Sequence, residues 1–197
     1  NYELSFVVDD LNNNSKWRKF CNIEQVPIVS SIQTRFSKYS VEQIVNLVNK
    51  LLRTNFYRKQ HEKLTFIVDA TPVDVDINFI RKHYSKKYFS KMDLKWSYSS
   101  SKGHYIGYKV TMVLEKNSLT PVLILIHNGA PHDTKIYKEV LENLKQSRII
   151  RPLDILLFDK GYFSYENYRI GIIEYRIIPL IFPRENYNKN KLLNPII

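Results

Sequence analysis

Apolar residues recur at helical spacing in the first third of the chain. The strongest repeat begins after Ser40, which can cap a helix, and consists of Val41, Ile44, Val45, Val48, Leu51 and Leu52. A shorter repeat after Pro27 consists of Ile28, Ile32 and Phe36. These patterns predict a small helical region over residues 1–62. Two helices with polar outer faces can contact DNA, although such pairs more often only pack against each other.

The apolar pattern becomes extended after Lys63. Runs of β-branched or alternating apolar residues predict five strands, over residues 64–69, 105–115, 122–127, 153–158 and 175–182. Helical spacing predicts a helix from Ile136 to Leu144, capped by Asp133 or Thr134, and a shorter helix over residues 162–173. The predicted order is three strands, a helix, a strand, a helix and a final strand.

This order matches a ribonuclease H-like layout and predicts the α/β fold class. In that layout an antiparallel three-stranded meander is followed by crossovers that add parallel strands beside the first, and helices flank the mixed sheet. We therefore assign residues 63–197 to one core that follows the helical region. Asp69 and Asp159 each follow one of the parallel strands, and ligands gather at the carboxyl ends of such strands. The two acids are expected to face one site.

Two carboxylates at one edge of a sheet repel each other unless a cation lies between them. Divalent metal ions prefer such oxygen ligands, and paired ions can activate a water or a 3′-hydroxyl for phosphoryl transfer. The alternative is that Asp69 and Asp159 only stabilise turns, as Asp often does before a glycine such as Gly161. Each acid alone favours the turn, whereas the pair, in this order of elements, favours a metal site.

The chain is strongly basic and contains one cysteine. Lys and Arg number 30 against 19 Asp and Glu, a net charge of +11, which favours a polyanionic partner such as nucleic acid. A basic surface without a ligand is the alternative. Cys21 alone cannot form an intrachain disulfide or a cysteine-based zinc site, and the longest apolar run, over about residues 121–126, is too short to span a bilayer. These features predict a soluble, cytoplasmic protein.

Basic and aromatic residues alternate in an insertion between the first two predicted strands, at about residues 79–104. Together with Lys109 in the following strand, its cations are Arg81, Lys82, Lys86, Lys87, Lys91, Lys95 and Lys102. Its aromatic residues, with the adjacent Tyr105, include Tyr84, Tyr88, Phe89, Trp96 and Tyr98. Cations bind phosphates and aromatic rings stack on unpaired bases, so the insertion is a candidate DNA-binding segment. The alternative is a solvated loop whose rings pack on the sheet.

Three motifs occur in an order that is typical of one family of enzymes. They are Ile67-Val68-Asp69-Ala70-Thr71, Gly103-His104-Tyr105-Ile106-Gly107-Tyr108-Lys109 and Phe158-Asp159-Lys160-Gly161-Tyr162. With them the chain resembles the DDE transposases of bacterial and archaeal insertion sequences, over about residues 64–185. The resemblance implies that Asp69 and Asp159 are the first two catalytic acids, and that they bind the Mg²⁺ or Mn²⁺ that drives DNA strand cleavage and transfer.

Two further features of that family bear on the site. His132 and Asp133 resemble the family's His-Asp pair after the third strand, and they could lie just behind the metal ligands. The alternative is that Asp133 caps the following helix, as Asp before a helix usually does. Its third acid is a Glu on a helix after the fifth strand, in a fixed succession with Tyr, Arg and Lys. Beyond Phe182 the only acid is Glu185, in a run without helical periodicity. We therefore expect a core that is incomplete at the C-terminus and inactive as it stands.

The resemblance also implies partners and a cellular setting. Double-stranded DNA, as element ends and as target, would be bound by a homo-oligomer in a prokaryotic cytoplasm, associated with the nucleoid and not with a membrane. Two alternatives stay open: a catalytically dead remnant that only binds DNA, and another ribonuclease H-like nuclease. Strand joining, as opposed to hydrolysis alone, would separate a transposase from a nuclease.

Overall fold

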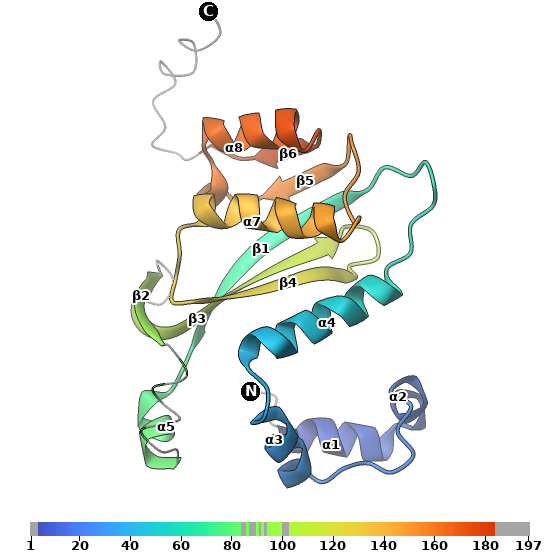
Figure 1. Cartoon of the computed structure of the whole chain (residues 1–197), viewed down its shortest axis with the longest axis vertical. Coiled ribbons are helices and arrows are strands. Elements are labelled where there is room, and N and C mark those ends of the chain that lie inside the picture. The colour runs from blue at the N-terminus through green and yellow to red at the C-terminus, as the bar shows by residue number, and fades with distance from the viewer. Residues whose placement is uncertain are drawn as a thin grey trace, which may run out of the picture. The chain divides into compact units, whose positions relative to one another are not determined.

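The computed structural model describes residues 4–83, 86, 90, 92, 94–99 and 103–183, and the chain comprises two compact units, Asn1–Ile44 and Val45–Ile197 (Figure 1). The boundary lies inside the long helix that begins after Ser40, whereas the sequence pattern had placed it at residue 62. No helix of the described residues is long and apolar enough to cross a membrane.

The smaller unit is built from helices. It contains α1 (Leu4–Asn13), α2 (Ser15–Phe20), α3 (Val29–Phe36) and the first turn of α4 (Val41–Asn55). Ser40 caps α4 as predicted: the Gln43 N–H donates to Ser40 Oγ at 3.2 Å, and the Ser40 N–H donates to Gln43 Oε1 at 2.9 Å. The apolar repeats had indicated α3 and α4 but not α1 or α2, whose large side chains Phe6 and Trp17 are exposed.

The rest of α4 and the segment after it belong to the larger unit. The Asn49 side chain exchanges two hydrogen bonds with the backbone of Ile124, at 2.7 and 2.8 Å. Phe56 packs against Phe66 of the core, with ring centroids 6.3 Å apart. These contacts explain why the unit boundary precedes residue 62.

A six-stranded mixed sheet forms the centre of the larger unit. Its strands are β1 (Thr65–Asp74), β2 (Lys95–Ser99), β3 (Gly103–Glu115), β4 (Pro121–Asn128), β5 (Ile155–Phe158) and β6 (Ile178–Ile181). β1, β3 and β4 pair as an antiparallel meander, and β5 and β6 extend the sheet from β1 as parallel strands. The predicted α/β fold class with a ribonuclease H-like sheet is therefore confirmed.

Two features of the sheet were not predicted. β1 continues past Asp69 to Asp74, and β2 adds a strand inside the expected insertion. Both pair with the first half of β3, so that residues 70–74, β2 and residues 103–109 form a ribbon, called here the arm, and α5 (Ile77–His83) follows β1 at its far end (Figure 1). Gly107 lets β1 and β3 approach closely, because a Cβ there would collide with the Val73 carbonyl oxygen.

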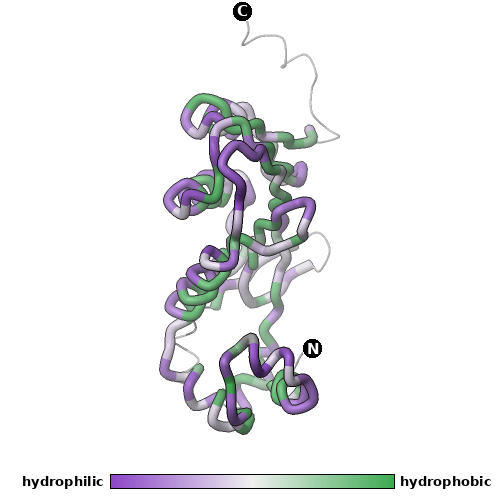
Figure 2. The backbone as a smooth tube through the Cα atoms, turned by 90° about the vertical axis from the view of Figure 1, so that its right-hand side faces the viewer, coloured by the Kyte–Doolittle hydropathy of each residue, from purple (hydrophilic) through white to green (hydrophobic). Residues whose placement is uncertain are grey.

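The hydrophobic core lies between the sheet and α7 (Asp133–Gln146). The buried side of α7 consists of Ile136, Tyr137, Val140, Leu141 and Leu144. These residues share a core cluster with alternate residues of the parallel strands, among them Phe66, Val68, Leu156 and Phe158. Figure 2 shows the strands as largely hydrophobic and the exposed connections as hydrophilic. The sheet is thus anchored firmly on the face that α7 covers.

The connection from β5 to β6 is irregular. One helix was predicted over residues 162–173, but the chain forms the 3₁₀ turn η1 (Lys160–Tyr162), α8 (Tyr165–Arg169) and the π-helical turn η2 (Ile170–Glu174). Gly171 of η2 lies against Tyr137 of α7, since a Cβ on this glycine would collide with the Tyr137 hydroxyl. The irregular turn therefore allows the segment to pack closely on α7.

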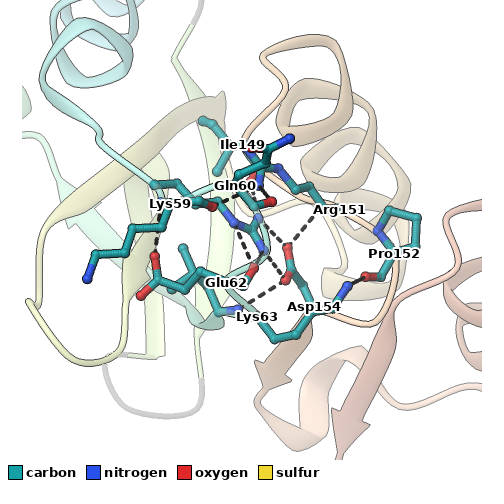
Figure 3. A network of polar contacts seen from close by, with 10 residues as sticks. Lys59, Gln60, Glu62, Lys63, Ile149, Arg151, Pro152 and Asp154 are labelled. Carbon is teal, nitrogen blue, oxygen red and sulfur yellow. Dashed lines mark hydrogen bonds and ion pairs between the residues drawn. The ribbon is translucent and has the colours of Figure 1, made fainter.

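A buried ion pair fixes the start of the two central parallel strands (Figure 3). Arg58 and Asp154, whose side chains are 3% and 0% exposed, form a bidentate pair with N···O distances of 2.7 and 2.5 Å. Asp154 also accepts the backbone N–H groups of Leu64 and Arg151, and Arg58 directs its other donors to backbone carbonyl oxygens. Because Leu64 precedes β1 and Asp154 precedes β5, the pair helps to set the register of both strands.

Candidate metal-binding site

Asp69 and Asp159 lie at the same level on neighbouring strands. β1 and β5 are in parallel register from Thr65 with Ile155 to Val68 with Phe158, and the next residue on each strand is one of the acids. Adjacent strands are about 5 Å apart, so the two backbones are close at this point. The predicted adjacency of the strands is confirmed, with one correction. Asp69 does not end its strand, because β1 continues to Asp74 with β3 as its partner.

Both carboxylates are exposed, and each has one oxygen engaged in a local hydrogen bond. Asp69 Oδ1 accepts the Ala70 N–H at 2.8 Å, and Asp159 Oδ1 accepts the Lys160 N–H at 2.6 Å. Within the described part of the chain, the second oxygen of each carboxylate has no hydrogen-bond or ion-pair partner. Two such oxygen donors fit Mg²⁺ or Mn²⁺, which bind one or two carboxylates together with water and phosphate oxygens.

A third protein ligand is not found among the residues that the structure describes. No group of three or more His, Cys, Asp or Glu side chains able to hold a metal ion occurs in residues 4–83 and 103–183 or in the short described stretches between them. Glu185, the only acid after Phe182, lies outside the described residues. The described chain therefore offers two metal ligands at this edge.

Asp133 is not the cap of α7 that the sequence suggested. The cap is His132, whose Nδ1 accepts the Thr134 N–H at 3.4 Å. Asp133 instead pairs with Lys109 of β3, at 2.5 Å between Oδ1 and Nζ. Lys109 also donates to the Pro131 carbonyl oxygen, and its side chain is only 14% exposed. Lys109 is thus engaged within the protein, unlike the exposed cations among the expected DNA contacts.

The Asp133 carboxylate lies against the turn that carries Asp159. Its Oδ2 is so close to Gly161 that a Cβ on the glycine would collide with it. The glycine of the Asp-Lys-Gly-Tyr turn is therefore needed for a close approach between this turn and the start of α7.

Replacing Gly161 with Ala is expected to destabilise the protein by about 1–3 kcal/mol, the usual cost of an overpacked site. Moving the carboxylate away from a new Cβ would weaken its ion pair with Lys109, so the clash is not relieved without cost. Denaturant unfolding should show this loss in the wild-type background and a much smaller loss in an Asp133→Ala background. Equal losses in the two backgrounds would contradict the contact.

A buried tyrosine with no role predicted from the sequence lies within electrostatic range of Asp69, Asp133 and Asp159. Tyr162 ends η1, and its side chain is 1% exposed. Burial raises the pKa of its hydroxyl well above the usual range, and the carboxylate of Asp133 raises it further. The neighbouring Thr111 hydroxyl lowers the pKa, and the carboxylates of Asp69 and Asp159 add smaller increases. The hydroxyl is therefore a neutral donor at physiological pH.

The arm, α5 and Lys86 between them carry the described part of the expected DNA-binding segment. Its exposed cations are Arg81, Lys82, Lys86 and Lys95. Trp96 and Tyr98 of β2 are also exposed, at 73% and 63%, whereas the side chain of Tyr105 is buried. The remaining candidates lie outside the described residues, namely Lys87, Lys91, Lys102, Tyr84, Tyr88 and Phe89. The two rings of β2 therefore present surface to a ligand instead of packing into the core.

Comparison with known proteins places these features in a family. Residues 60–195 match the sequence model described as the transposase DDE domain. Among curated proteins, none matches the chain. A solved cryo-EM structure of a piggyBac transposase synaptic complex with hairpin DNA is similar to the chain, with 13% sequence identity, a TM-score of 0.49, and coverage of 83% of this chain and 32% of that one. The chain thus spans about a third of the length of that protein. Because the family match takes in more than half of the chain and both candidate acids, the chain belongs to the transposase DDE domain family.

Proposed function

We propose that this chain is the catalytic part of a DNA transposase of insertion-sequence type, which cleaves and transfers DNA strands with divalent metal ions held by Asp69 and Asp159. The observation that carries the proposal is the parallel register of β1 and β5, which brings the two carboxylates to one edge of the sheet. Family membership supports the class of reaction.

The chain's own residues supply the frame for this chemistry. Mg²⁺ or Mn²⁺ at the edge would act as a Lewis acid that activates a water or a 3′-hydroxyl and stabilises the departing oxygen. Asp69 lies in β1 where this strand pairs with β3, and Asp159 accepts the N–H of Lys160 in the turn that follows it. Asp133 pairs with Lys109, so it supports the turn without adding net charge to the site. Such fixed positions reduce the cost of ordering the site during the reaction.

Nicking of supercoiled plasmid DNA by this chain, with and without Mn²⁺, tests the proposal. If a residue outside the described part of the chain supplies the third metal ligand, we expect nicks that require Mn²⁺ or Mg²⁺ and disappear with EDTA. A core that lacks the third acid would give none. Joined products with DNA that carries the element ends would indicate a transposase, and hydrolysis alone would indicate another ribonuclease H-like nuclease. Nicking that continues unchanged in EDTA would contradict the metal site.

A second candidate is a catalytically dead chain that only binds DNA. It is favoured by one observation: the described residues contain no group of three metal-ligating side chains at this edge. This candidate predicts no metal-dependent nicking, together with DNA binding that weakens steeply as salt concentration rises. The plasmid assay therefore separates it from the first.

The exposed rings of the arm are proposed to stack on unpaired bases next to the cleavage site. Trp96→Ala and Tyr98→Ala are each expected to weaken binding of a single-stranded oligonucleotide by about 1–3 kcal/mol. Fluorescence anisotropy at fixed salt measures the effect, with Tyr57→Ala as the control, since Tyr57 is 82% exposed but lies outside the arm. Equal affinities for the arm variants and the control would argue against stacking.

The proposal extends to the assembly that acts on DNA. Cleavage and transfer of an element require both of its ends, so we propose a homo-oligomer bound to double-stranded element ends and target, in a prokaryotic cytoplasm. The exposed cations of α5 and β2 would then neutralise phosphates of the bound duplex.

A further inference from the structure

Two buried hydroxyl groups lie near each other, close to the edge of the sheet that carries Asp69 and Asp159, called here the metal edge. Tyr162 and Thr111 are 1% and 0% exposed, and the hydroxyl of Thr111 is near enough to that of Tyr162 to affect its ionisation. Neither oxygen has a hydrogen-bond partner of normal geometry among the described residues. A buried polar group without a partner is unfavourable, so its retention requires a reason.

Tyr137 of α7 provides a comparison within the same core. It is also fully buried, and its hydroxyl also lacks a hydrogen-bond partner among the described residues. The ionisable groups that affect it are the phenols of Tyr168 and Tyr175, and its hydroxyl lies against Gly171. The surroundings of Tyr162 differ, because it directly follows Gly161, against which the Asp133 carboxylate lies. The charges of Asp133, Asp69 and Asp159 also raise the pKa of its hydroxyl.

Among the three acids, the Asp133 carboxylate has the largest effect on the pKa of the Tyr162 hydroxyl. Its Oδ1 is paired with Lys109, whereas its Oδ2 lies against Gly161, the residue that precedes Tyr162. A divalent ion attracts nearby carboxylates, which repel one another in its absence. A small inward shift of Asp133 would give the buried hydroxyl a charged acceptor, and such hydrogen bonds are stronger than those between neutral groups.

We propose that Tyr162 is a positioning residue of the metal edge, whose buried hydroxyl, supported by Thr111, donates to Asp133 when a divalent ion is bound at Asp69 and Asp159. This inference rests on the proposed function. The hydrogen bond forms in the ion-bound state only, so it strengthens ion binding without stabilising the ion-free protein. It also stabilises the turn from Asp159, which caps η1, to Tyr162.

Titration of the chain with Mn²⁺ alone, followed by calorimetry, tests the proposal. Tyr162→Phe removes only the hydroxyl, and we expect Mn²⁺ to bind about tenfold more weakly, as when other groups behind metal ligands are lost. The melting temperature of the ion-free variant should stay equal to that of the wild type or rise, because an unpaired buried group has been removed. Thr111→Val should weaken Mn²⁺ binding to a smaller extent.

Two further variants make the outcome decisive. Tyr137→Phe removes a comparable buried hydroxyl away from the acids, and it should leave Mn²⁺ affinity unchanged. In an Asp133→Asn background, Tyr162→Phe should have a much smaller effect, because the charged acceptor is gone. This inference would be overturned if Tyr162→Phe bound Mn²⁺ within twofold of the wild-type affinity while Asp69→Asn lost binding. The proposed function would then still stand. Equal Mn²⁺ binding by wild type and Asp69→Asn would overturn both.

Discussion

Replacing Asp69 or Asp159 with Asn is expected to reduce metal-dependent DNA nicking by about a thousandfold or more, while DNA binding persists. Asn preserves the shape of Asp but removes the charge that attracts the ion. An ion at this edge contributes several kcal/mol to the transition state, and each 1.4 kcal/mol or so corresponds to a tenfold change in rate. Plasmid nicking in Mn²⁺ and anisotropy with labelled DNA measure the two effects separately.

Asp74→Asn is a matched control for these substitutions. It removes a carboxylate from the same strand, at a position paired with Gly107 in the arm and away from β5. Nicking by this variant should resemble that of the wild type. Wild-type rates in Asp69→Asn or Asp159→Asn would instead rule out the assignment of catalytic acids.

Removing one partner of the buried Arg58–Asp154 pair is expected to lower the free energy of unfolding by about 3–5 kcal/mol. Arg58→Met leaves Asp154 as a fully buried carboxylate without its cation. Asp154→Ala leaves the Arg58 guanidinium buried without its carboxylate. The Asp154 variant also loses the acceptor for the Leu64 N–H, directly before β1. Urea unfolding monitored by circular dichroism measures the loss.

The exposed pair Lys138–Glu142 on α7 is the control for the buried pair. Its groups are 3.9 Å apart with side chains 58% and 48% exposed, so Lys138→Met should cost less than about 0.5 kcal/mol. If Arg58→Met cost no more than Lys138→Met, the buried pair would not stabilise the parallel strands. Replacing both buried partners with apolar residues should recover part of the loss, because no unpaired charge would remain.

The sequence was sufficient where a physical rule acts locally or along one strand. The helical repeat and the Ser40 cap predicted α4, and the apolar runs that lead to Asp69 and Asp159 predicted the two strands of the candidate site. The β2 segment also has an alternating pattern, in which Trp96 and Tyr98 are separated by polar residues. This period of two indicates a strand as well as stacking groups, although the segment was predicted as part of an insertion.

Other features depend on contacts between distant segments. A local capping rule favoured Asp133, but His132 can serve as the cap, and Lys109 on another strand draws the carboxylate away. Arg58 and Asp154 form an ion pair although they are 96 residues apart in the sequence. One local feature indicates such a pair: Asp154 lies within the apolar run that ends at Phe158, and a buried acid needs a partner. Tyr162 belongs to the most specific motif, but the motif does not show that its hydroxyl is buried without a hydrogen-bond partner.

The location of Mn²⁺ in crystals of the chain, from its anomalous scattering, tests the metal site directly. We expect a peak within about 2.5 Å of a carboxylate oxygen from both Asp69 and Asp159. Asp133 should lie behind the peak, in contact with the turn at Gly161. Mn²⁺ bound only at other acids, with none between β1 and β5 at saturating concentration, would show that these two strands do not form a metal site.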